Sequence, residues 1–462
     1  MPQGEPIHPA PPGRLAPLNI FQFLARQWDQ VHPYNAAQAI EVVGVADLSQ
    51  INAAWADTLA SLGLGRVRLT ACGHFGFEVL NGQMRNYPSR VVRPSTSLND
   101  YLTAEVNRPF TDDGEPPFRL FVRQGERTFH LGVIYQHWTA DSVSVQGILR
   151  ELFYRLYDPS KAQRAPSRIQ DTGYWGMYGP RHGRWKMDEN LFGLARRYFR
   201  YRRVRKVNGV GLDDPSVRFR SQRAPAGLID GLRTGAKQAG VRVHDVLVAA
   251  MAEACAIHVP SQFRKRRRDL AVGSIIDLRP LSRQDLSGVF GLYLGFTGII
   301  VHEADLHYWP RLVRSVASQN QHHKDLGIPQ TSLAWMLAAR FIGQFVPRER
   351  LWHFYRKEMP LSGGLSNVNL TTGWAAAYAP TLICDYLRVS PTGPLAPLAL
   401  ATTTFGDTFT AGLTYRQSLI DDALADRYLD TFMARLKSVA AVDTPPAKAT
   451  LSRPYVNLEL LK

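Results

Sequence analysis

The feature that most constrains this fold is a change of hydrophobic periodicity within residues 128–157. Its first part alternates apolar and polar positions, as a strand with one buried face does, at Phe129, Leu131, Val133 and Tyr135. Its second part repeats apolar residues at helical spacing, at Val145, Leu149, Leu152 and Leu156. The sequence therefore predicts a strand, a sharp turn and a buried helix in direct succession.

Two side chains at this junction could carry chemistry. His137 follows the last strand residue, and Asp141 or Ser142 is a natural N-cap for the helix. An imidazole can act as a general base near neutral pH, and backbone N–H groups at a helix start can face a reacting group. The HxxxD spacing is short enough to arise by chance, so a core histidine beside a plain helix cap is the alternative interpretation.

The remaining pattern mixes strands and helices without regular βαβ alternation, which predicts an α+β fold of several units over 462 residues. We expect a hairpin over 118–136 and three late strands at 381–390, 398–406 and 408–416, all three in the second lobe. The predicted organisation is a flexible N-terminus (1–14), an N-terminal lobe carrying HxxxD (15–158), a basic aromatic connection (159–223) and a C-terminal lobe (224–462).

Composition excludes several classes of protein. The 3 cysteines lie far apart, without the spacing of a thiolate zinc site or a disulfide framework, which favours a reducing compartment. The start of the chain has no apolar region typical of a secretory signal, and no apolar run is long enough to cross a bilayer. We therefore expect a soluble cytoplasmic protein without a transmembrane segment.

The net charge of +16 is concentrated in two runs. Arg181–Lys206 interleaves cations with aromatic residues, and Arg264–Arg268 is a continuous cationic run. No zinc-finger spacing or RNA-binding aromatic motif accompanies them, so a nucleic-acid partner is not expected. They could be a solvated face, a docking surface for an acidic partner or an anchor on an anionic membrane surface.

Other candidate motifs give weaker evidence for a function. The segment around Ser366 lacks the second glycine of a hydrolase nucleophile elbow, so a serine hydrolase is not expected. His322 and His323 have no carboxylate or thiol at ligand spacing, so we expect no metal. The glycines between residues 288 and 298 match no nucleotide-binding pattern.

The junction QHWTADS resembles the HHxxxDG motif of the condensation-domain and CoA-dependent acyltransferase superfamily, which has the chloramphenicol-acetyltransferase-like fold. Further similar segments follow in the family's order: HPYN, VRVHDVLVAAMAEA, SIIDLRP, LSNVNL and LTYRQSLIDDALADRYLDTF. The resemblance covers residues 15–440. The chain departs from the pattern at Gln136, which replaces the first histidine, at Ser142, which replaces the glycine, and at Asp277, where asparagine is frequent.

The resemblance implies two lobes that form a V around a central tunnel. His137 would be the catalytic base, and Asp141 would be structural, paired with Arg279. A backbone N–H near Ser142 could donate to the oxyanion. Trp138, Ser366 and Asn367 would line the tunnel.

The function that the resemblance implies is acyl transfer from a phosphopantetheine thioester, on a carrier protein or CoA, to an amine or hydroxyl acceptor in secondary metabolism. No cofactor would stay bound, and we expect a free-standing monomer that docks an acyl or peptidyl carrier protein through its basic surface. Two alternatives remain open. One is a wax-ester or acylglycerol synthase at a membrane surface, and the other is a non-catalytic module that recruits partners.

Overall fold

The computed structural model describes residues 15–441 apart from several segments. The residues left out are 79–86, 112–114, 164–165, 170–198, 202, 208–213, 263–266, 283, 328–331, 333–335, 338–339, 342–344, 348–349, 351–359, 372–373, 375–381 and 394–395. The predicted N-terminal segment 1–14 therefore lies outside the described residues, as do most of the Arg181–Lys206 run and residues 264–266.

The first of two large sheets is built mainly by the N-terminal part of the chain. Its strands are β2 (Asn35–Val43), β5 (Arg90–Val92), β6 (Phe118–Gln124), β7 (Thr128–Gln136) and β16 (Ile383–Val389). They lie in the order β16–β2–β7–β6–β5. β6 and β7 form the predicted antiparallel hairpin, and β5 runs parallel to β6. The hairpin prediction is confirmed.

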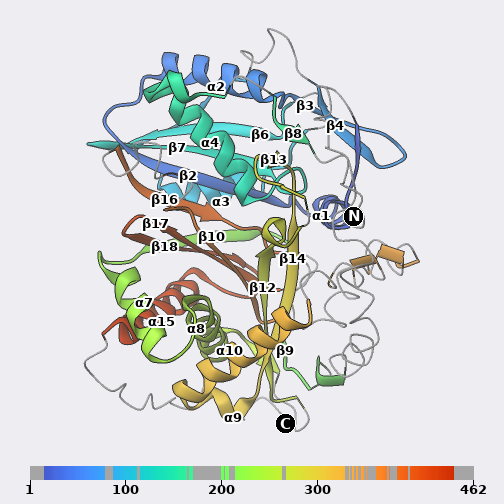
Figure 1. Cartoon of the computed structure of the whole chain (residues 1–462), viewed down its shortest axis with the longest axis vertical. Helices are drawn as coiled ribbons and strands as arrows, with labels where there is room; N and C mark the ends of the chain where they lie inside the picture. Colours follow the sequence, from blue (N-terminus) through green and yellow to red (C-terminus); the bar gives the residue numbers. More distant parts are fainter. Residues whose placement is uncertain are drawn as a thin grey trace, which may run out of the picture.

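Helices cover both faces of this sheet. They are α1 (Ile20–Asp29), α2 (Leu48–Leu62), α3 (Leu98–Val106) and α4 (Ser142–Tyr157). Alternate β7 residues Leu131 and Val133 pack into the core that α2 and α4 complete, whereas Ile134 packs on the α3 side. α2 ends at Gly63, whose φ of 72° is a left-handed conformation that favours glycine. Figure 1 shows α2 and α4 on the outer side of the sheet.

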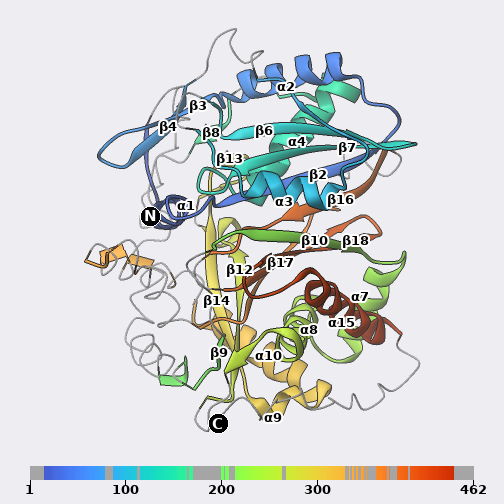
Figure 2. The ribbon, with the colours of Figure 1, turned by 180° about the vertical axis from the view of Figure 1, so that it is seen from behind.

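The second sheet has six strands in the order β10–β18–β17–β15–β12–β14. Its strands are β10 (Val217–Arg223), β12 (Leu270–Asp277), β14 (Leu294–Val301), β15 (Gly363–Asn369), β17 (Leu398–Phe405) and β18 (Thr408–Arg416). The helices of this lobe are α7 (Leu228–Gln238), α8 (Val243–His258), α9 (Glu303–Leu306), α10 (Trp309–Asp325) and α15 (Asp422–Ala440). Their apolar side chains form a second core with one face of the sheet. Figures 1 and 2 show these helices on the side away from the first lobe.

Short strands complete the described structure. They are β1 (Ala16–Pro17), β3 (Arg66–Leu69), β4 (His74–Glu78), β8 (Arg168–Ile169), β9 (Lys206–Val207), β11 (Ser261–Gln262) and β13 (Val289–Phe290), with 3-10 turns at Pro159–Lys161 and Arg279–Leu281. β1, β3 and β4 form a small sheet, and β8 pairs with β13. Within the described ranges, no helix has both the length and the apolar character needed to cross a membrane.

The lobes are α+β, as predicted, but the pairing of two strands does not follow the predicted division at residue 224. β10 was assigned to the connection, yet it pairs along its whole length with β18 in the second sheet. β16 was assigned to the second lobe, yet it pairs with β2 in the first sheet. Both strands carry enough apolar residues for either sheet, so their pairing depends on long-range contacts that local periodicity does not specify.

The two sheets approach closely where β16 passes β18. A Cβ at Gly412 would lie 2.5 Å from the carbonyl oxygen of Arg388 and 2.9 Å from the ring of Phe219. Only glycine leaves room for this approach. In Figure 2, α3 and the edge strand β16 lie on the side of the first lobe that faces β10.

Candidate active site

His137 lies in the turn between β7 and α4, as predicted. Its backbone N–H donates to the carbonyl oxygen of Tyr34 at 3.1 Å. Its ring stacks on the Tyr34 ring, with centroids 5.5 Å apart, and meets the Tyr135 ring edge-on at 5.7 Å. These contacts hold a side chain that is only 8% exposed.

The hydrogen bonds of the imidazole determine its tautomer. Nδ1 lies 2.8 Å from the carbonyl oxygen of Ala140. A carbonyl oxygen can only accept, so Nδ1 carries the hydrogen and Nε2 carries the lone pair in the neutral ring. In the part of the chain that the structure describes, Nε2 has no hydrogen-bond partner. The atom that could remove a proton from a substrate is therefore Nε2.

Burial also favours the neutral form of His137. Desolvation lowers the pKa of His137 below its ordinary value of 6.5, and the nearby charge of Arg388 lowers it further. The Ala140 carbonyl and Asp141 act in the opposite direction but do not reverse the shift. At neutral pH the imidazole is ready to accept a proton.

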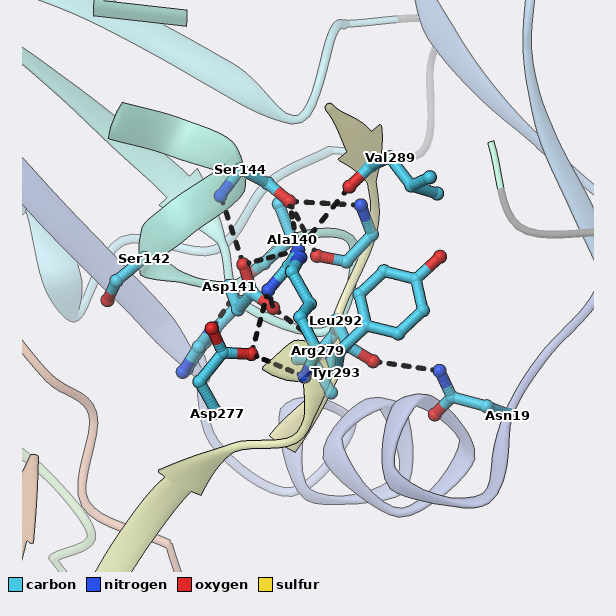
Figure 3. Close-up of polar contacts among 12 residues, drawn as sticks. Asn19, Ala140, Asp141, Ser142, Ser144, Asp277, Arg279, Val289, Leu292 and Tyr293 are labelled. Carbon is cyan, nitrogen blue, oxygen red and sulfur yellow. Dashed lines mark hydrogen bonds and ion pairs between the residues drawn. The ribbon is translucent and has the colours of Figure 1, made fainter. Parts of the chain in front are cut away.

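Asp141 forms the predicted ion pair with Arg279. The two Arg279 terminal nitrogens lie 2.7 Å and 3.1 Å from the two Asp141 carboxylate oxygens. Asp141 also accepts from the backbone N–H groups of Ser144 and Tyr293, at 3.0 Å and 2.9 Å. Figure 3 shows this cluster with Asp277, which lies 3.3 Å from the Arg279 guanidinium. These contacts occupy both carboxylate oxygens of Asp141.

This cluster attaches the segment after β12 to the start of α4. The Ser144 hydroxyl donates to the Gly291 carbonyl at 2.8 Å and accepts from the Gly291 N–H at 3.0 Å. Asn19, the N-cap of α1, donates to the Leu292 carbonyl at 2.9 Å. Residues that follow the second-lobe strand β12 thus hold the turn that carries His137.

Ser142 begins α4 and points away from the Asp141–Arg279 pair in Figure 3. Its hydroxyl accepts from Arg388 at 3.0 Å, and the same nitrogen donates to the hydroxyl of Ser366 at 2.7 Å. Arg388 lies on β16 and Ser366 on β15, so this contact brings the start of α4 together with the second sheet. The structure therefore joins the predicted Ser142 and Ser366 through a residue that the sequence analysis did not single out.

The other predicted residues have different surroundings. Trp138 is 4% exposed and packs edge-on against Phe75 in the first core. Asn367 is partly exposed and accepts from Thr402 at 2.9 Å. Gln136 donates to Asp29 at 2.7 Å, so the residue in place of the family's first histidine ties β7 to α1. Of the three predicted lining residues, only Ser366 and Asn367 are partly exposed.

Sequence reasoning missed Arg388, Tyr34 and Ser144. Tyr34 stands in the HPYN segment, and Ser144 stands in the first turn of a predicted helix, so their positions gave some signal. Arg388 interrupts an apolar strand pattern, and a polar residue in a strand is ordinarily taken as solvent-facing. Across the described ranges, no group of three His, Cys, Asp or Glu side chains could hold a metal ion.

Comparison with known proteins identifies similar folds. Neither the protein-family models nor the curated protein sequences match this chain. Among solved structures, the TRI3 trichothecene 15-O-acetyltransferase from Fusarium sporotrichioides has a TM-score of 0.64 at 12% identity, over 94% of this chain and 99% of that chain. The starter condensation domain of rhizomide synthetase RzmA has a TM-score of 0.62 at 12% identity, over 94% and 96%. The X-domain in its complex with OxyB from teicoplanin biosynthesis has a TM-score of 0.55 at 16% identity, over 95% and 96%. The shared fold extends over nearly the whole chain.

Proposed function

We propose that this chain, which has the fold of the condensation domains and of the trichothecene acetyltransferase, is an acyltransferase. It would move an acyl group from a phosphopantetheine thioester to an amine or hydroxyl acceptor in the biosynthesis of a secondary metabolite. The observation that carries the proposal is the buried His137, whose Nε2 has no hydrogen-bond partner among the described residues. It lies at the turn where the two lobes meet. The RzmA neighbour, whose structure holds C8-CoA and Leu-SNAC, supports the choice of substrates.

In the proposed reaction, His137 Nε2 accepts the proton of the acceptor as its nitrogen or oxygen attacks the thioester carbonyl carbon. The carbonyl electron pair moves onto oxygen, where the N–H groups at the start of α4 can stabilise the negative charge. Collapse of this intermediate breaks the carbon–sulfur bond, and the thiolate takes the proton from His137. The products are an amide or ester and a free phosphopantetheine thiol.

Mass spectrometry of the full chain with thioester donors tests this function. Acyl-carrier-protein, acyl-CoA and acyl-pantetheine donors are each combined with mixtures of amines and alcohols. We expect a product whose mass equals that of the acceptor plus the acyl group. If donor hydrolysis occurs without acylated product across the panel, the chain is not an acyltransferase for these donors.

The pH dependence follows from the lowered pKa of His137. The base must be neutral, so kcat/KM should fall about tenfold per pH unit below the His137 pKa and stay flat above it. Because desolvation lowers that pKa, the bend should lie below 6.5. A pH–rate profile of the wild-type protein measures it. A bend above 6.5 would contradict the assignment of His137 as the buried base.

The described ends of the two basic runs lie side by side, which supports the proposed carrier-protein surface. β9 pairs with β11, and Arg205 Nε donates to the carbonyl oxygen of Arg268 at 2.8 Å. Arg267 donates to the Val204 carbonyl oxygen at 3.3 Å, while Arg203 and Arg268 are exposed. Two runs that are remote in sequence therefore meet at one edge of the second lobe. Such a surface would attract the acidic surface of a carrier protein.

Charge reversal at Arg203 and Arg268 should raise KM for an acyl-carrier donor and leave a short acyl-pantetheine donor nearly unaffected. The matched control is Arg233→Glu on α7, an exposed arginine that pairs with Asp230 as Arg268 pairs with Glu303. Added salt should weaken the carrier reaction alone, because screening acts over about 8–10 Å. If charge reversal and salt affect both donors equally, this surface does not bind a carrier protein and is an ordinary solvated face.

A partner-recruiting module without catalysis is the second candidate, since the X-domain neighbour was solved in complex with OxyB. It predicts stable complex formation with a partner and no acyl transfer.

The membrane-surface alternative has one observation in its favour, the exposed side chains of Leu337, Phe341 and Phe345. Co-sedimentation of the protein with lipid vesicles would support the membrane-surface alternative, and its absence would contradict it.

A further inference from the structure

Arg388 is a buried cation whose described partners are all neutral. Its side chain is 2% exposed. One terminal nitrogen donates to the hydroxyls of Ser142 and Ser366, and the other lies 3.4 Å and 3.3 Å from the carbonyl oxygens of Ser366 and Thr402. Its Nε is buried and has no hydrogen-bond partner among the described residues. Among the described residues Arg388 forms no ion pair, and burial lowers the pKa of its guanidinium although the nearby charge of Asp141 acts in the opposite direction.

Three other largely buried arginines of this protein have carboxylate partners. Arg279 pairs with Asp141, Arg119 pairs with Glu105, and Arg435 pairs with Glu253. A charge removed from water without a counter-ion is costly, and a carboxylate that reaches it recovers much of that cost. Arg388 thus has the surroundings of a group whose counter-ion arrives with a ligand.

The surroundings of Arg388 belong to the reaction centre. Ser142 is the first residue of α4, directly after Asp141 and close to the His137 turn. The positive charge of Arg388 is near enough to His137 to lower the pKa of the imidazole. Gly364 lies two residues before Ser366 on the same face of β15, and a Cβ there would meet nothing within 4 Å. Open space therefore lies at Gly364, on the face of β15 that carries Ser366.

We infer that Arg388, with the hydroxyls of Ser142 and Ser366, binds a carboxylate carried by one of the two substrates. A carboxylate matches the fork of N–H groups on a guanidinium, and both serine hydroxyls can turn to donate to it. The start of α4 adds a favourable dipole. The identification of the ligand as a substrate rests on the proposed acyl transfer, whereas the anion site itself does not.

Calorimetric titration of the full chain at neutral pH tests the site with four pairs of probes. The pairs are acetate and acetamide, benzoate and benzamide, hexanoate and hexanamide, and N-acetylglycine and N-acetylglycinamide. We expect at least one acid to bind about tenfold or more tightly than its amide, since hydrogen bonds between charged partners are stronger than neutral ones. Arg388→Gln should abolish the preference, and Arg388→Lys should retain part of it. Equal binding of acid and amide in every pair, or a preference that survives in Arg388→Gln, overturns the inference.

Thermal unfolding distinguishes a ligand-binding arginine from a structural one, because removal of a structural arginine should lower the melting temperature. Arg388→Met removes an uncompensated buried charge, so it should melt no lower than wild type. Arg435→Met, the matched control, breaks the buried pair with Glu253 and should melt several degrees lower. If Arg388→Met loses as much stability as Arg435→Met, or does not fold, Arg388 is a structural residue and the inference is wrong.

Two further comparisons separate this inference from the proposed function. His137→Ala should lose acyl transfer but keep the preference for the acid, because the anion site does not use Nε2. In turnover, acceptor acids are compared with their amides, and succinyl donors with butyryl donors, in wild type and Arg388→Lys. If Arg388→Lys raises KM only for the acceptor acids, the acceptor carries the carboxylate. If it raises KM only for the succinyl donors, the donor carries it. If neither series shows a selective rise, no substrate carboxylate binds at Arg388.

Discussion

Replacement of His137 by alanine is expected to lower acyl transfer by about 10²–10⁴-fold, the usual contribution of a positioned general base. Of the two imidazole nitrogens, Nε2 is the one without a hydrogen bond in the described part of the chain, so its loss removes the proton acceptor. The measurement is kcat/KM with a thioester donor, together with the melting temperature.

The matched control is His130→Ala, which removes a partly buried histidine from the preceding strand β7. This variant should keep its turnover. His137→Ala should also lose the low-pH limb of the rate profile, which a merely weakened fold would retain. Full turnover in His137→Ala would show that the reaction does not use this base.

The second large effect is expected at Asp141, where alanine should lower the free energy of unfolding by about 3–5 kcal/mol. The substitution leaves the Arg279 charge buried without its main partner, and it removes the acceptor for the N–H groups of Ser144 and Tyr293. Chemical denaturation measures the change. Activity should fall as well, because the turn that carries His137 loses its attachment to the second lobe.

Two variants show whether the uncompensated charge is the cause. Glu78→Ala breaks the exposed pair with Arg66 and should cost no more than about 1 kcal/mol. The double variant Asp141→Ala with Arg279→Met should recover part of the stability, because neither charge then remains alone. If Asp141→Ala unfolds at the same denaturant concentration as wild type, the ion pair does not stabilise the fold.

Local pattern was enough to predict the elements that build the reaction centre. The alternation of β7, the helical repeat of α4 and the polar turn between them are properties of neighbouring residues, so periodicity reveals them. The place of His137 at a strand–helix junction followed directly. Its ion-pair neighbours Asp141 and Arg279 are 138 residues apart and came from family resemblance, since spacing alone does not bring them together.

The tertiary structure decided what surrounds these residues. Whether β16 joins the first or the second sheet depends on the register of β2 and on the close approach at Gly412, which are long-range properties. That pairing places Arg388 in the interior beside Ser142 and Ser366, although its sequence position predicts a solvent-facing residue of a strand. The sequence by itself determined which residues could do chemistry at the turn. The packing of two sheets determined their electrostatic environment, because the cost of a charge depends on the partners and the water around it, and no local pattern records either.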